Sequence, residues 1–112
     1  MLDYERLDVY QRAIEHLAVA VRILNDMPKG QAALADQLKR AALSIPLNIA
    51  EGSGKPEGAD RIRYVNIARG SAMECGAIHD ATRILGAAKL DDVAEAKLLI
   101  ERIVSMLTRM SR

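Results

Sequence analysis

The fold of this chain is decided by residues 44–55, which read SIPLNIAEGSGK. The apolar residues in the first half of this stretch recur at the three- and four-residue steps of an α-helix, with Pro46 in the middle. Proline has no backbone N–H to donate, so the helix should kink there. Gly52 and Gly54 then break the helix, and Lys55 begins a basic entry into the next one. The stretch therefore predicts two consecutive helices joined by a glycine-rich loop.

The same periodicity extends over the rest of the chain. Helices are expected at about residues 5–26, 31–51, 60–86 and 92–110. The 112 residues include no Phe or Trp and only 3% aromatic residues, so Ala, Leu, Ile and Val must fill the core. Four helices with short connections predict an all-α, antiparallel up-down-up-down four-helix bundle, with residues 1–112 as a single domain.

Each expected helix carries a line of residues, spaced by three and four, that should face the core. In the first helix the line is Leu7, Tyr10, Ile14, Leu17, Val21 and Leu24. In the second it is Leu34, Leu38, Ala41, Ile45, Asn48 and Gly52. In the third it is Tyr64, Ile67, Ser71, Glu74, Ile78, Ala81 and Leu85. In the fourth it is Val93, Ala96, Ile100, Ile103, Leu107 and Met110.

Glu74 is the most unusual member of these lines, because a carboxylate in a core is costly unless an opposite charge satisfies it. Antiparallel packing of the second and third helices places Glu74 level with Arg40, whose planar guanidinium can hold a carboxylate with two hydrogen bonds. We interpret the pair as structural, fixing the register of the two helices. The alternative is a catalytic acid or base with a shifted pKa.

Other residue types that often carry chemistry lack the required neighbours. His16 and His79 lie on different helices without a cysteine or carboxylate cluster, and are expected at the surface or its edge. Cys75 stands among small residues and is interpreted as a small core residue. Gly54 and Lys55 do not complete a phosphate-binding loop. The position of the motif's first glycine is occupied by Ile49, and no β-strand is expected before the loop. We therefore expect no catalytic residue, metal or cofactor, and no enzyme activity.

Leu43, Leu47 and Ala50 lie on the face of the second helix opposite its core line. A single bundle would leave this face in water. We interpret the three residues as part of a subunit interface, the alternative being scattered exposed apolar residues of no significance.

Basic residues gather near the loop between the second and third helices, although the net charge of the whole chain is only +1. Lys55, Arg61 and Arg63 lie close to the loop, and Arg69 follows on the outer side of the third helix. Repeated around a ring of identical subunits, these four side chains could contact a phosphate backbone. The alternative is ordinary solvated charge.

The motif over residues 40–55 and 67–74 resembles a known family of small four-helix-bundle proteins, encoded in intervening sequences of bacterial 23S ribosomal RNA genes. The positions that carry the resemblance are Arg40, Ala41, Ala42, Ile45, Pro46, Asn48, Ile49, Ala50, Glu51, Gly52, Lys55, Ile67, Ala68, Gly70, Ser71, Ala72 and Glu74. It extends to Leu7, Val9, Tyr10 and Ala13 near the N-terminus. The accessory variability proteins of diversity-generating retroelements are similar.

The resemblance implies a bundle that assembles as a homopentamer. For the retroelement branch it also implies binding of RNA or DNA and association with a reverse transcriptase. The polar positions of the motif, at Arg40, Asn48, Glu51, Ser71 and Glu74, are carried over as structural. A different function remains open, in which the ring is a protein-interaction scaffold that binds no nucleic acid. The sequence has no signal-peptide core or membrane span, so we expect a cytoplasmic protein.

Overall fold

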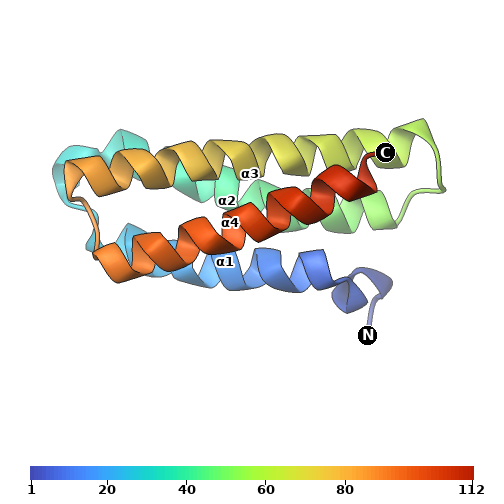
Figure 1. The fold of residues 1–112 in the computed structure, drawn as a ribbon, viewed down its shortest axis with the longest axis horizontal. Helices are drawn as coiled ribbons and strands as arrows, with labels where there is room; N and C mark the ends of the chain where they lie inside the picture. The colour runs from blue at the N-terminus through green and yellow to red at the C-terminus, as the bar shows by residue number, and fades with distance from the viewer.

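The computed structural model describes all 112 residues, and four α-helices run alternately in opposite directions along its long axis (Figure 1). The helices are α1 (Asp8–Asp26), α2 (Ala32–Ser53), α3 (Ala59–Leu85) and α4 (Leu90–Met110). Two short 3₁₀ helices, η1 (Asp3–Arg6) and η2 (Lys29–Gln31), precede α1 and α2. There is no β-strand, and the predicted all-α antiparallel four-helix bundle is confirmed.

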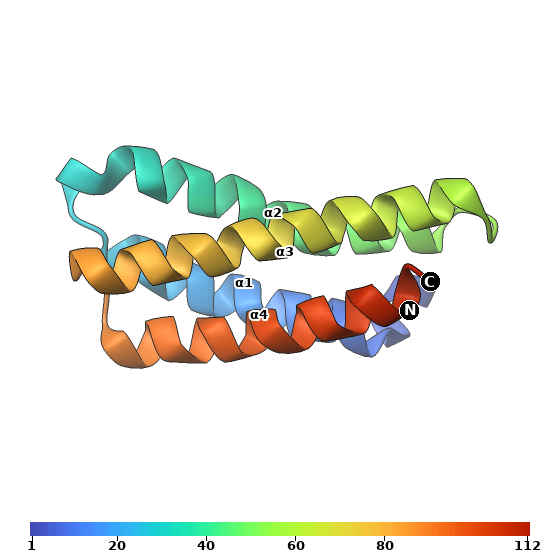
Figure 2. The same cartoon turned by 45° about the horizontal axis from the view of Figure 1, so that its top comes forward.

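Each helix packs against two neighbours, so the four axes form a square. α2 contacts α1 and α3, and α4 likewise contacts α1 and α3. The α2–α3 hairpin extends beyond the ends of α1 and α4, so that its loop projects from one end of the bundle (Figure 1, Figure 2). Gly54 and residues 56–58 in this loop are exposed, and Lys55 is half-buried.

The predicted core lines of α2 and α4 are confirmed in their central parts. The buried members are Leu38, Ala41, Ile45 and Gly52 in α2 and Val93, Ala96, Ile100, Ile103 and Leu107 in α4. α2 continues through Pro46, which is itself buried. α4 begins two residues before the predicted position, at Leu90, so Asp92 does not cap it; instead Asp92 accepts a hydrogen bond from Arg22.

Part of the predicted core lines of α1 and α3 is confirmed, since Ile78 is buried and Leu7, Tyr10, Leu17 and Leu24 pack half-buried against the core. The fully buried line of each helix nevertheless lies about one residue away from the predicted one. In α1 the buried line is Val9, Ala13, His16, Ala20 and Ile23. In α3 it is Val65, Ala68, Ala72, Cys75, His79 and Thr82. Ile14 and Val21, which were predicted to be buried, are 41% and 46% exposed. Ile67 and Leu85 are 39% and 53% exposed.

The size of the side chains explains this shift. The prediction followed the largest apolar residues, but Ala13 and Ala20 in α1 and Ala68 and Ala72 in α3 allow close packing toward the bundle centre. The larger residues on each side then pack at the edges of the core or remain exposed. The shift determines the positions of both histidines and of Glu74.

Gly86 ends α3 in the left-handed conformation, with φ of 62°. Its N–H donates to the carbonyl groups of Thr82 and Arg83. This is the common glycine termination of a helix.

Candidate functional site

The projecting end of the α2–α3 hairpin brings together a tyrosine and three basic residues. Tyr64, in the first turns of α3, belongs to the predicted core line but is only half-buried. The Cζ atom of Arg63 lies 4.4 Å from the centre of the Tyr64 ring, and the Nζ atom of Lys55 lies 5.6 Å from it. Both cations are therefore within the range of a cation–π interaction.

Gly52 explains why α2 and α3 approach so closely at this end. A Cβ atom added to Gly52 would lie 3.1 Å from the Cβ of Tyr64 and 3.5 Å from the carbonyl oxygen of Arg61. Any side chain at this position would push the start of α3 away from α2. The motif glycine thus positions Tyr64 beside the loop.

Arg61 holds the loop rather than facing solvent. Its Nε donates to the carbonyl oxygen of Lys55 at 2.9 Å, and its Nη2 donates to the same oxygen at 2.6 Å and to that of Ser53 at 3.3 Å. The Ser53 carbonyl is at the C-terminal end of α2, which carries a partial negative charge that a guanidinium stabilises, and the Lys55 carbonyl lies in the loop that follows. Arg61 was predicted to contact phosphate, but two of its three side-chain nitrogens are used to position the loop.

Lys55 and Arg63 remain available for a ligand. Lys55 lies 3.5 Å from Glu51 and Arg63 lies 3.1 Å from Asp60, in pairs one helical turn apart. The Arg63 side chain is 57% exposed, and exposed pairs of this kind contribute little free energy. A phosphate could replace either carboxylate at small cost.

Arg69 does not join this group. Its Nε donates to the Thr108 hydroxyl at 2.8 Å, on the side of α3 that faces α4. The structure therefore brings together three of the four predicted basic residues and places the fourth at another helix interface.

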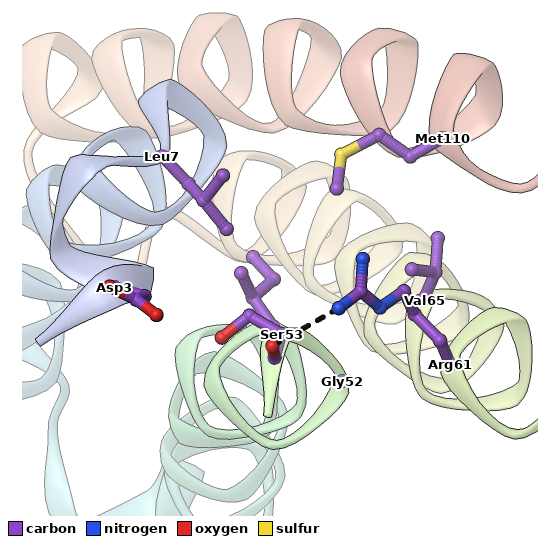
Figure 3. A pocket seen from close by; sticks show the side chains of 8 residues that line it. Asp3, Leu7, Gly52, Ser53, Arg61, Val65 and Met110 are labelled. Carbon is purple, nitrogen blue, oxygen red and sulfur yellow. Dashed lines mark hydrogen bonds between the residues drawn. The ribbon is translucent and has the colours of Figure 1, made fainter. Parts of the chain in front are cut away.

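A cavity of about 290 Å³ opens beneath Arg61 at this end of the bundle (Figure 3). It is lined by Asp3, Leu7, Ile49, Gly52, Ser53, Arg61, Val65 and Met110. In Figure 3 the Arg61 guanidinium extends toward Ser53, while Met110 of α4 lies on the far side. The walls are mostly apolar, with one carboxylate and one guanidinium.

Three of the five polar residues of the motif, Arg40, Ser71 and Glu74, line a second hollow of about 340 Å³ between α2 and α3, together with Ser44. The Ser71 hydroxyl donates to the Ser44 hydroxyl at 2.8 Å. The Asn48 side-chain amide donates to the Ser44 carbonyl oxygen at 2.8 Å and to the Ser44 hydroxyl at 2.9 Å. The bond between Ser71 and Ser44 links α2 to α3, whereas both Asn48 contacts lie within α2.

The predicted buried pair of Arg40 and Glu74 is wrong. Both residues line the same hollow, but both are exposed and no ion pair joins them. The one-residue shift of the α3 core line turns Glu74 away from the centre of the bundle. The carboxylate that was considered as a buried acid or base is therefore in contact with solvent.

The buried polar pair of the bundle is formed instead by His16 and His79. Their Nε2 atoms lie 2.8 Å apart, and both side chains are fully buried, so their expected surface position is wrong. Burial, with a smaller contribution from the other ring, lowers the pKa of His16 from 6.5 to about 3. Burial, with a smaller contribution from Lys97, lowers the pKa of His79 to about 4. Both imidazoles are therefore neutral at pH 7, and one Nε2–H donates to the other Nε2.

Neither histidine has a partner for its Nδ1 atom, and no third His, Cys, Asp or Glu joins them as a metal ligand. The sequence signal that could have revealed the pair is their place on the small-residue lines of α1 and α3. Cys75 is buried on the same line, as predicted. Burial raises the pKa of its thiol to about 12, so the thiol stays protonated.

Leu43 and Leu47 are 37% and 64% exposed on the outer face of α2, and Ala50 is half-buried. Glu51 is exposed, and its contact is with Lys55. No helix of the bundle is long and apolar enough to cross a membrane.

A family model described as 23S rRNA-intervening sequence protein matches residues 5–109. The match therefore covers all four helices. No match to a curated protein was found for the chain.

Proposed function

The chain belongs to the 23S rRNA-intervening sequence protein family, and we propose that it is a non-enzymatic, oligomeric accessory protein that binds nucleic acid through phosphate contacts. The observation that carries this proposal is the group formed by Lys55, Arg63 and Tyr64 at the projecting end of the α2–α3 hairpin. Cations attract a phosphate backbone, and an accessible aromatic ring beside them can stack on an unpaired base.

Assembly strengthens this proposal, because one bundle with a net charge of +1 attracts a polyanion only weakly. We propose a ring, a pentamer by family resemblance, in which the exposed Leu43 and Leu47 lie in the interface between subunits. Such a ring repeats the basic group at one end of each subunit. Several weak phosphate contacts then act together on one nucleic-acid molecule.

The resemblance to retroelement accessory proteins adds a reverse transcriptase as a candidate protein partner. A scaffold without nucleic-acid binding is favoured by one specific observation. Each of the four predicted cations has a partner within the chain, through Glu51, Asp60, Thr108 or the loop carbonyl groups. The two functions differ in whether phosphates replace these partners, which a titration can decide.

The experiment is fluorescence anisotropy with a labelled single-stranded RNA, a structured RNA and a DNA duplex, measured from low to physiological salt on protein sized by light scattering. We expect the logarithm of the affinity to fall linearly with the logarithm of the salt concentration. The Lys55→Gln/Arg63→Gln variant should bind more weakly and show a smaller salt slope, by roughly one for each phosphate that is no longer neutralised. Arg61 is left unchanged because it holds the loop.

Lys29→Gln/Lys89→Gln is the matched control, since it also removes two positive charges, and both residues are exposed at the other end of the bundle and form no ion pair. If the affinity falls equally in this control, the loss in the Lys55→Gln/Arg63→Gln variant is due to overall charge, and the proposed binding site is wrong. The absence of binding at low salt would reject the nucleic-acid function and leave the scaffold.

A further inference from the structure

An apolar groove runs along the outer side of α3 and α4, away from the basic end. Its floor and walls are formed by Met73, Gly76, Ala77, Ile100 and Val104. The volume is about 540 Å³, and Met73 is 54% exposed at its edge. Gly76 leaves space in the floor because it has no side chain; a Cβ atom there would occupy this space in ordinary contact with Ile100 Cγ2 at 3.5 Å. The groove can therefore receive a branched apolar side chain.

Glu101 lies on the rim of this groove and forms no ion pair within the chain. The other charged residues of the rim, Asp80 and Lys97, bind each other. The groove thus presents one uncompensated negative charge beside an apolar surface.

The outer face of α2 has the complementary character. Arg40, Leu43 and Leu47 follow one another at steps of three and four, so they form one outward line. Leu43 and Leu47 protrude into solvent, and Arg40 has no ion-pair partner in the chain. This line therefore offers apolar side chains beside one uncompensated positive charge.

The two surfaces also match in height along the bundle axis. The contact of Ser44 with Ser71 shows that these two residues of α2 and α3 lie at the same height along the bundle axis. The approach of Gly76 to Ile100 does the same for α3 and α4. Because consecutive helices are antiparallel and rise equally per residue, Arg40 is then level with Glu101.

By the same relation, Leu43 is level with Val104 and the Met73 end of the groove. Copies related by rotation about an axis along the bundle meet at equal heights. The charges and the apolar residues therefore come into register together.

We propose that the α3–α4 groove of one subunit receives the Leu43 face of α2 from a second copy of this chain, with Arg40 of that copy beside Glu101. The two contacting surfaces differ, so the interface is heterologous. A heterologous contact gives a ring when the repeated rotation closes on itself, and an open filament when it does not. This inference rests on the oligomer proposed above and specifies which surfaces of the chain meet in it.

The test is a charge exchange followed by light scattering over a range of protein concentrations. Glu101→Arg and Arg40→Glu should each place like charges together and raise the midpoint concentration of assembly at least about tenfold. The Glu101→Arg/Arg40→Glu double variant restores an opposite pair and should assemble again. Glu57→Arg is the control, with the same charge change at an exposed loop position that has no ion pair.

Circular dichroism should show that each variant keeps its helices, since all three substituted residues are exposed. An unchanged midpoint for Glu101→Arg, or a double variant that stays dissociated, would overturn the assignment of the groove. In both cases the proposed ring would survive through other surfaces. A wild-type chain that is monomeric at every concentration would instead reject the ring and the groove together.

Discussion

Lowering the pH from 7 to 5 should destabilise the bundle through His16 and His79. In an unfolded chain a histidine has a pKa near 6.5, so at pH 5 both imidazoles would be mostly protonated. In the folded chain the pKa values of about 3 and about 4 keep both neutral at pH 5. The unfolded state therefore binds more protons, and stability falls as the pH falls below 6.5.

The size of the effect follows from the distance between pH 5 and the unfolded pKa. Each histidine should lower the free energy of unfolding by about 2 kcal/mol. One pKa unit corresponds to about 1.4 kcal/mol, and pH 5 lies roughly 1.5 units below the unfolded pKa. The pair should therefore cost about 4 kcal/mol, a large part of the stability of a small domain. Carboxyl groups titrate mainly below pH 5 and contribute little over this interval.

The assay is urea unfolding followed by far-ultraviolet circular dichroism at pH 7, 6 and 5. The control is the His16→Leu/His79→Leu variant, which removes both titrating groups and also the two unpartnered Nδ1 atoms. Its unfolding free energy should change little between pH 7 and 5. A wild-type chain that loses less than about 1 kcal/mol over this interval would refute the buried, neutral pair.

Two substitutions test the packing of α2 against α3. Glu74→Ala should change the free energy of unfolding by less than about 0.5 kcal/mol, because the side chain is exposed and forms no ion pair. A loss of several kcal/mol would instead support a buried ion pair with Arg40. Gly52→Ala should destabilise by about 1–3 kcal/mol, since the added methyl group approaches the Cβ of Tyr64 at 3.1 Å. Gly54→Ala, whose Cβ would make an ordinary contact at 3.5 Å, is the matched control, and equal effects of the two would contradict the close approach.

The helices of this fold could be predicted from the sequence because apolar periodicity and the glycine-rich break after α2 are local signals. The core line of α2 was also predictable, since Leu38 and Ile45 are both apolar and large. In α1 and α3 the core line holds alanines and one histidine each, while larger apolar residues lie beside it. Periodicity alone cannot choose between two adjacent lines when the smaller residues face the centre.

The part of the candidate site that depends on residues close in sequence was predictable, and the part that depends on contacts between distant segments was not. Lys55 and Arg63 are close in sequence to the loop, so their proximity needed only the hairpin. The second role of Arg61, as a donor to two loop carbonyl groups, depends on the path of residues 53–55 after the helix ends. The contact of Arg69 with Thr108 depends on a helix that is distant in sequence.

The five polar residues of the motif divide into two groups once their positions are known. Asn48 and Ser71 both bond to Ser44, and Glu51 contacts Lys55, so the isolated chain accounts for these three. Arg40 and Glu74 have no ion-pair partner in the chain and face outward from the same hollow. A single bundle needs neither charge for its own stability, because exposed single charges contribute little to folding. Their function must therefore be sought in what this face contacts, and the charge exchange at Arg40 tests that directly.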